Sequence, residues 1–170
     1  YIYGWRHVPV NVECLGEKAN ATRPEIEQIL ISNSKGVDEE TFERELYVIR
    51  RRIEKAATGA GINGLYIASL SCRSIIYKGM MLAEQVADFY PDLLDDRFES
   101  AFAIYHQRYS TNTFPQWWLA QPFRMLAHNG EINTLKGNVN WMKSHEIRMD
   151  SSSFGDHAED IKPIIANGAS

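Results

Sequence analysis

The clearest element in the hydrophobic pattern is a long helix predicted over residues 38–57. Its apolar residues recur at spacings of three and four and so form one stripe along the helix: Phe42, Leu46, Ile49 and Ile53. Asp38 is a good N-cap because its carboxylate accepts hydrogen bonds from first-turn amides. Gly59 and Gly61 follow the end, where left-handed backbone is needed. Three consecutive arginines at 50–52 fan around the axis, which favours separate structural contacts over a phosphate site.

Short apolar runs predict strands along much of the remaining chain. Residues 1–15 are expected to form a strand, an irregularity at Pro9 and a second short strand ending at Leu15. A strand is favoured over 24–31 because Pro24 and the β-branched residues agree. Four further strands are predicted, the first two joined by a turn at Cys72-Arg73: 64–71, 74–78, 101–105 and 123–127.

Shorter helices are predicted over 80–89 and from near Asn133 or Asn138. The second of these is expected to turn Val139, Met142 and Ile147 inward. Residues 16–20 and 150–160 are predicted to be loops, the latter a mobile one on the surface. Strands outnumber helices in this reading and several join through short turns. The predicted fold class is therefore α+β with antiparallel sheets.

Composition places the chain among ordinary globular domains. With 170 residues, 44% hydrophobic and 24% charged, it is expected to be one domain with a substantial core. A net charge of −4 and a pI near 5.7 argue against a general nucleic-acid binder. No apolar run approaches the roughly 20 residues that cross a bilayer. Two cysteines, Cys14 and Cys72, make neither a disulfide framework nor a zinc site, which fits a reducing, cytoplasmic location.

The two ends of the sequence suggest a longer polypeptide. Tyr1 is not a methionine, and residues 1–5 already resemble the middle of a strand. Residues 164–170 stop without closing an element. We therefore expect this chain to be an internal piece.

The candidate chemistry lies between residues 100 and 141. The apolar runs 101–105 and 123–127 each end on a cluster of polar residues, 106–112 and 128–131. Strands that carry polar residues off their ends are a typical scaffold for a site.

Arg108 is the first candidate. A guanidinium flanked by the hydroxyls of Ser110 and Thr111 grips a carboxylate with two parallel charge-assisted bonds. The alternative is a surface salt bridge, which the residues alone favour.

Asn129 and Gly130 are the second candidate. An amide side chain and a glycine N–H after a strand are neutral donors suited to an oxyanion hole. The alternative is an ordinary Asn-Gly turn. His106 and His128 are possible general bases, but a structural histidine is the more common case. Trp117 and Trp118 are expected to pack in the core or a lid.

The motifs HQRYSTNTFP, LAQPF and LAHNGEIN resemble the class II glutamine amidotransferases, which are N-terminal-nucleophile (Ntn) hydrolases. The resemblance covers nearly the whole chain, from YIYGWR through ATRPEIEQ and RSIIYKGM to GNVNWM. It implies an Ntn αββα sandwich with antiparallel sheets, incomplete here. Residues 1–170 are then the central part of a single glutaminase domain.

The resemblance also implies roles for individual residues. Arg108 would bind the α-carboxylate of L-glutamine, with Tyr109 and Thr111 completing that motif. Asn129 and Gly130 would form the oxyanion hole. Gln121, in the shared AQPF segment, would line the pocket, although a simple loop hydrogen bond is its alternative.

The family's nucleophile is an N-terminal cysteine whose own amino group acts as the base, so neither histidine is expected to serve. Cys14 and Cys72 match no motif position, and the acidic residue that holds the substrate amino group is expected beyond Ser170. The nucleophile therefore lies outside this chain, and the chain alone is expected to be inactive.

Within the family, the long region 1–99 and GNVNWM resemble the glutamate synthase branch. That implies a parent that sends ammonia to a flavin domain, which makes glutamate from 2-oxoglutarate. The implied cofactors, FMN and an iron–sulfur cluster, belong to other domains of the same polypeptide, and an NADPH-oxidising small subunit is the implied partner. The alternatives are another class II amidotransferase, or an Ntn-like binding domain without a nucleophile.

Overall fold

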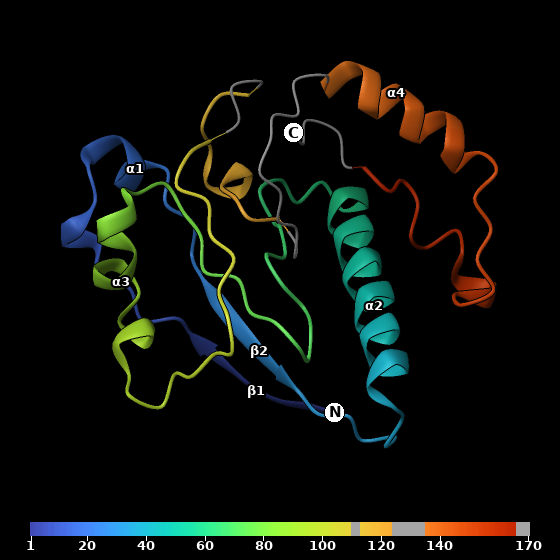
Figure 1. Ribbon diagram of the computed structural model, residues 1–170, viewed down its shortest axis with the longest axis horizontal. Coiled ribbons are helices and arrows are strands. Elements are labelled where there is room, and N and C mark those ends of the chain that lie inside the picture. Colours follow the sequence, from blue (N-terminus) through green and yellow to red (C-terminus); the bar gives the residue numbers. More distant parts are fainter. Residues whose placement is uncertain (110–112, 124–134, 166–170) are drawn as a thin grey trace. The chain divides into compact units, whose positions relative to one another are not determined.

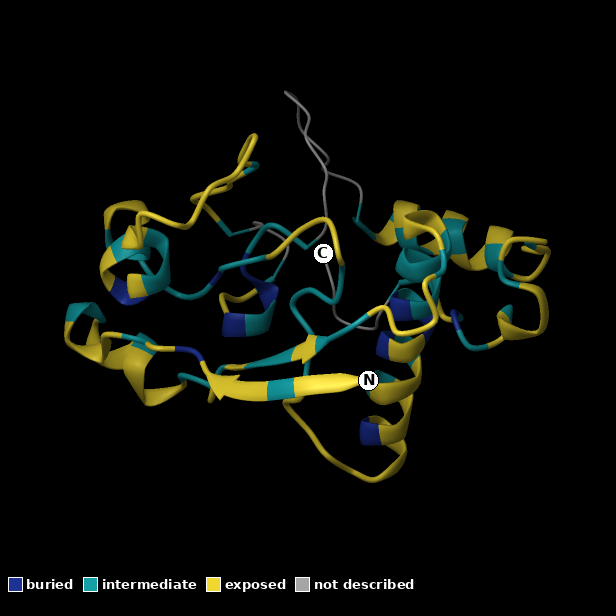
Figure 2. Cartoon of the chain, turned by 90° about the horizontal axis from the view of Figure 1, so that it is seen from below, coloured by how far each residue is buried: buried dark blue, intermediate teal, exposed yellow. Residues whose placement is uncertain are grey.

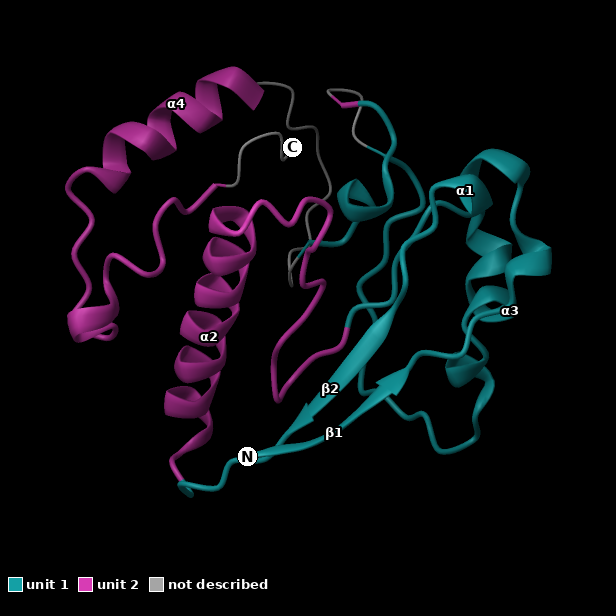
Figure 3. Cartoon of the chain, turned by 180° about the vertical axis from the view of Figure 1, so that it is seen from behind, with its two compact units in different colours: residues 1–36, 76–109, 114–127 teal, residues 37–75, 110–113, 128–170 magenta. Residues whose placement is uncertain are grey.

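The computed structural model describes residues 1–109, 113–123 and 135–165. The chain divides into two compact units, coloured separately in Figure 3. The first combines residues 1–36, 76–109 and 114–127, and the second combines 37–75, 110–113 and 128–170. Both mix helix with irregular structure, and a small antiparallel sheet lies in the first unit. The prediction of mixed helix and antiparallel strand is confirmed at this level.

The sheet of the first unit consists of strands β1, Ile2–His7, and β2, Glu27–Ile31 (Figure 1). They pair antiparallel with Trp5 opposite Ile29, and the register shifts between Ile2 and Gly4. Both strands lie where the sequence predicted them. Most of β1 is exposed, as Figure 2 shows.

Residues 9–22 differ from the prediction. In place of a second strand there is a 3-10 helix, Val12–Cys14, because the Asn11 side chain accepts a hydrogen bond from the Glu13 N–H and caps it. In place of a loop, α1 spans Glu17–Ala21. Its glutamate, lysine and alanines favour helix, a local preference that the loop prediction overlooked.

The core of the first unit forms around Phe89, which is fully buried. Val8, Tyr90 and Trp117 surround it, and the Phe89 and Tyr90 rings meet edge to face with centroids 4.6 Å apart. A 3-10 turn, Ala83–Gln85, leads into α3, Val86–Phe89. The predicted helix over 80–89 therefore exists in its second half. Another 3-10 helix, Trp117–Leu119, carries Trp117 into the core.

The second unit is built on α2, Glu39–Gly59. Asp38 caps it as predicted, with 3.0 Å between its Oδ1 and the Thr41 backbone nitrogen. Gly61 has φ of +71°, which fits the expected left-handed geometry after the helix. The same prediction is wrong for Gly59, which is the last residue of α2 and has no positive φ. The predicted apolar stripe is wrong in part, since Ile49 and Ile53 are exposed. The buried positions are Leu46, Val48, Arg50 and Ala57. Helical spacing alone does not decide which side meets a neighbour.

The three arginines of α2 extend to different contacts, as the fan-shaped arrangement predicted, although Arg50 and Arg51 share Glu54, whose carboxylate lies 2.7 Å from Arg51. Arg50 is buried, lies 5.0 Å over the Tyr47 ring and is 3.8 Å from Glu54. Arg51 donates to the Pro163 carbonyl at 2.6 Å, and Arg52 donates to Asp160 at 2.8 Å. No phosphate site is needed to explain these residues.

Residues 150–165 are attached to α2. The Phe154 ring lies 5.8 Å from that of Tyr47, and Lys55 donates to the Glu159 carbonyl at 2.6 Å. A 3-10 helix, Gly155–His157, lies within this segment. The loop prediction is confirmed in outline, but ion pairs and a ring contact hold the segment in place.

The second predicted helix is α4, Leu135–Glu146. Val139 and Met142 are half-buried, as expected for its inner side. Ile147, by contrast, is 84% exposed, so its predicted inward position is wrong. The helix ends one residue earlier, and Ile147 lies in the following turn.

Three predicted strands are absent from the described residues. Residues 64–71, 74–78 and 101–105 are irregular, although bends at Cys72 and Arg73 mark the predicted turn. The strand predicted over 123–127 lies outside the described residues beyond Phe123. A strand exists only where a neighbour supplies the hydrogen-bond ladder, so apolar β-branched sequence is not sufficient.

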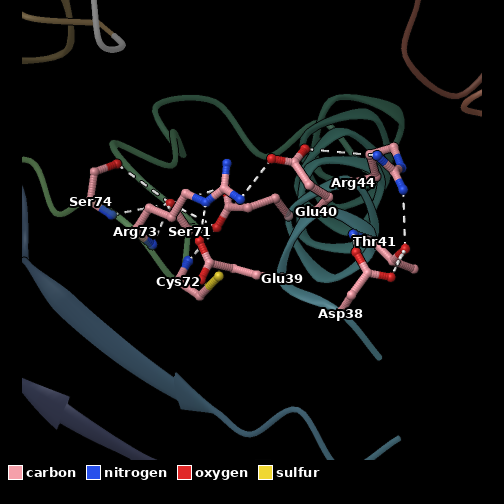
Figure 4. A network of polar contacts seen from close by, with 10 residues as sticks. Asp38, Glu39, Glu40, Thr41, Arg44, Ser71, Cys72, Arg73 and Ser74 are labelled. Carbon is pink, nitrogen blue, oxygen red and sulfur yellow. Dashed lines mark hydrogen bonds and ion pairs between the residues drawn. The ribbon is translucent and has the colours of Figure 1, made fainter. Parts of the chain in front are cut away.

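The bend at 71–74 is held instead by side chains of α2 (Figure 4). The Glu43 carboxylate accepts hydrogen bonds from the Ser71 hydroxyl at 2.9 Å and from the Cys72 N–H. Arg73 forms ion pairs with Glu39 and Glu40. Polar contacts with a helix thus replace the pairing that a hairpin would have supplied.

Candidate functional site

Arg108 follows the apolar run 101–105 and is exposed on a bend. Its backbone N–H donates to Nδ1 of His106, with 3.1 Å between the two nitrogens. Its guanidinium makes no ion pair with any other residue in the described part of the chain. A guanidinium that forms no ion pair with the described residues suits an arginine whose partner is a ligand carboxylate.

His106 makes a local structural contact, and a structural role is more common for a histidine than that of a general base. Because Nδ1 accepts from the Arg108 N–H, the neutral ring carries its proton on Nε2. His106 therefore orders the bend that presents Arg108. The H-x-R spacing is the sequence signal for this contact.

Tyr109 is half-buried beside Arg108. Its hydroxyl donates to the carbonyl of Gly79, with 3.3 Å between the oxygens. This bond connects the residue after Arg108 to the segment 77–79 of the same unit. Gly79 in turn lies against Trp117, leaving no room for a side chain.

Gln121 is half-buried and follows the 3-10 helix Trp117–Leu119. Its peptide bond to Pro122 is cis. The carbonyl of Ala120, immediately before it, accepts a hydrogen bond from Lys78 Nζ at 3.0 Å. Gln121 is thereby also connected to the segment 77–79.

Two predicted site segments, one at Tyr109 and one at Gln121, are thus hydrogen-bonded to the same segment, residues 77–79. Sequence reasoning missed Lys78 and Gly79, having read residues 74–78 only as a strand. A lysine followed by glycine after an apolar run was the available signal, but it is a weak one.

The segment 77–79 is itself fixed to the sheet through a polar cluster. Tyr77 donates to Oδ2 of Asp92 at 3.0 Å, and Arg6 of β1 forms an ion pair with the same carboxylate. The hydrogen bond from Arg6, with that from Tyr77, lowers the pKa of Asp92 despite partial burial. Asp92 therefore stays ionised and keeps both donors in place.

Thr111, Asn129 and Gly130 lie outside the described residues, as does His128. It stays a prediction that Arg108, the proposed carboxylate clamp, and the Asn129-Gly130 oxyanion hole share one cavity.

Neither a metal site nor a disulfide appears among the described residues. No group of three or more His, Cys, Asp or Glu side chains there is arranged to hold a metal. Cys14 and Cys72 are free thiols. Within the same residues, no helix has the length and apolar character needed to cross a bilayer.

Comparison with known proteins assigns the chain to a family. The family model for class-II glutamine amidotransferases matches residues 1–170. The chain is 73% identical over its full length to the glutamate synthase [NADPH] large chain of Azospirillum brasilense, covering 11% of that protein. It is 49% identical, over 96% of its length, to the large chain of the same name from Bacillus subtilis, again covering 11%.

A plant relative is similar at a lower level. The chloroplastic ferredoxin-dependent glutamate synthase of Oryza sativa is 48% identical over 96% of the chain and is covered to 10%. The chain therefore spans about a tenth of the length of these relatives. Since the family model matches every residue, the chain belongs to the class-II glutamine amidotransferases.

Proposed function

We propose that residues 1–170 are the central part of a single glutaminase domain in a glutamate synthase large chain. The domain hydrolyses L-glutamine to glutamate and ammonia. The observation that carries this proposal is the 73% identity, over the full length of the chain, to a glutamate synthase large chain.

Arg108 binds the α-carboxylate of glutamine in this proposal. The planar guanidinium donates two parallel hydrogen bonds to the two carboxylate oxygens, which sets the orientation of the substrate as well as its affinity. The Arg108 side chain supports this role because it is exposed, has no ion pair among the described residues, and lies on a bend where His106 accepts a hydrogen bond from its backbone N–H. Tyr109 and Thr111 complete the carboxylate end of the site, and Gln121 lines the pocket.

Asn129 and Gly130 act at the other end of the substrate. The nucleophile is a cysteine outside this chain, because Cys14 and Cys72 have no free α-amino group to act as base. Its thiolate attacks the side-chain amide carbon, and the resulting oxyanion accepts hydrogen bonds from the Asn129 amide and the Gly130 N–H. Ammonia then leaves as it takes up a proton, and water hydrolyses the thioester to glutamate. Loss of one oxyanion donor typically costs about 2.7–4 kcal/mol in the transition state.

We infer that the two-stranded sheet β1–β2 is part of a four-layer αββα sandwich in the complete domain. Segments elsewhere in the polypeptide would supply further strands. This accounts for runs such as 64–71, which have strand-like sequence but form no β-ladder within the described residues.

The parent protein would use the ammonia in a second reaction. In our proposal it passes to a flavin domain that makes glutamate from 2-oxoglutarate. FMN and an iron–sulfur cluster belong to that part of the polypeptide, and an NADPH-oxidising small subunit is the electron-donating partner. The 73% identity to the Azospirillum [NADPH] large chain, against 48% to the ferredoxin-dependent enzyme of Oryza sativa, supports this donor over ferredoxin.

The clamp is tested by Arg108→Ala in the full-length polypeptide. We expect KM for glutamine to rise at least roughly 10- to 100-fold, since even one hydrogen bond to a charged group contributes about 1.5–3 kcal/mol. Arg97→Ala is the matched control, because Arg97 is exposed and pairs with Asp95. An unchanged KM in Arg108→Ala removes the assignment.

A second measurement tests the proposal as a whole. The purified 170-residue chain should release no ammonia from glutamine, whereas the full-length polypeptide should. A full-length polypeptide that binds glutamine without releasing ammonia would instead identify a binding domain without a nucleophile.

A further inference from the structure

Lys78 is a buried lysine that the proposed mechanism does not use. Only 9% of its surface is exposed. Its Nζ donates to the carbonyl oxygens of Trp118 at 2.9 Å and Ala120 at 3.0 Å. It also lies 4.7 Å over the ring of Phe123. These contacts fall on both sides of Gln121.

The two carbonyls occupy a position that needs a donor. They lie at the end of the 3-10 helix Trp117–Leu119, where the last carbonyls of a helix have no helical partner. Ala120 is buried, so leaving its carbonyl without a hydrogen bond costs about 1–3 kcal/mol. A lysine ammonium has three donors and reaches both oxygens at once.

The backbone of Lys78 is itself held in the core. Its carbonyl accepts a hydrogen bond from the buried Tyr90 hydroxyl, with 2.7 Å between the oxygens. The next carbonyl, that of Gly79, accepts from Tyr109. The backbone of Lys78 is therefore held in place by Tyr90, and the adjacent Gly79 carbonyl binds Tyr109, the residue next to Arg108.

We propose that Lys78 is a positioning residue for the glutamine site, and that its ammonium fixes the backbone on either side of Gln121. The inference rests on the proposed function of this chain as a glutaminase domain. Lys78 acts through Gln121 and its neighbours and does not touch the substrate.

The charge itself favours this role over simple core packing. Burial lowers the pKa of Lys78 to about 8. Keeping the ammonium charged here at neutral pH therefore reduces the free energy of unfolding. The accepting carbonyls favour the charged form and limit that cost. An apolar side chain would pack without the cost but would leave the carbonyls before Gln121 unfixed.

The test is a set of variants in the full-length polypeptide assayed with L-glutamine. We expect Lys78→Met to raise KM for glutamine about tenfold, and Lys78→Arg, which keeps charge and donors, to restore part of the loss. Lys18→Met is the control, because Lys18 is exposed on α1 of the same unit. If Lys78→Met does not fold, Lys78→Gln replaces it under the same criteria.

A double variant separates positioning from stability. If Lys78 acts through Gln121, the KM of Lys78→Met/Gln121→Ala should exceed that of the more affected single variant by less than twofold. Independent effects that multiply, or a KM for Lys78→Met within twofold of wild type, would overturn the inference. Absence of glutaminase activity in the wild-type polypeptide would instead refute the proposed function itself.

Discussion

The Glu43 carboxylate accepts a hydrogen bond from the Ser71 hydroxyl, with 2.9 Å between Oε1 and Oγ. This contact joins α2 to the bend at residues 71–74, where the sequence predicted a hairpin. Burial alone would raise the pKa of Glu43. The hydrogen bonds at Cys72 and Ser71 outweigh burial, so the pKa is lowered overall.

The first prediction concerns pH and stability. Because the folded-state pKa of Glu43 is depressed, its stabilisation is present above the unfolded value near 4.5 and is lost as pH falls through the folded value. Glu43→Gln should lower the free energy of unfolding at pH 7 by about 1–2 kcal/mol. The difference from wild type should shrink below about pH 4. Urea unfolding at both pH values measures this, with the exposed Glu25→Gln as control. A difference that stays constant down to pH 3 would contradict the assignment.

The second prediction concerns Cys72. The thiol is exposed, yet hydrogen bonding to Glu43, with some burial and the charges of Glu43 and Glu39, raises its pKa to about 11. In a Cys14→Ser background, alkylation by iodoacetamide at pH 8 should be about tenfold slower than for a free thiol. That figure combines the smaller thiolate fraction with the higher nucleophilicity of a more basic thiol. Glu43→Gln should accelerate the reaction, and an unchanged rate would refute the contact.

The third prediction concerns Gly79, whose carbonyl holds Tyr109. A Cβ here would lie 2.9 Å from Cε3 of the buried Trp117 and closer still to Cζ3. Gly79→Ala should therefore destabilise the chain by roughly 1–3 kcal/mol, as expected for overpacking. Gly4→Ala, where a Cβ meets nothing within 4 Å, is the matched control. Equal stability of the two variants in urea unfolding would show that Trp117 moves away freely.

The fourth prediction concerns the core of the first unit. Phe89 is fully buried against Tyr90 and Trp117. Phe89→Ala should cost about 3–5 kcal/mol in unfolding free energy, and Phe89→Leu clearly less. Phe102, which is 66% exposed, supplies the control, and Phe102→Ala should stay within about 0.5 kcal/mol of wild type. A small loss in Phe89→Ala would mean that the site collapses to fill the cavity.

Among candidate site residues, sequence identified the chemical groups but not their support. Arg108 was chosen for its guanidinium and Gln121 for its motif. Their connection to His106, Gly79 and Lys78 depends on contacts between segments far apart in the chain. Hydrophobic periodicity carries no information about a lysine that caps the carbonyls of a remote helix.

The sequence by itself determined the elements whose hydrogen bonds are local. Helix α2 with its Asp38 cap is the clearest case, because each backbone bond in a helix closes within four residues. Tertiary structure decided which strand-like runs became strands and which face of α2 was buried. A ladder and a packed face both need a partner from elsewhere in the chain. Within the predicted strand 24–31, residues 27–31 pair with β1, whereas residues 64–71 pair with no strand among the described residues.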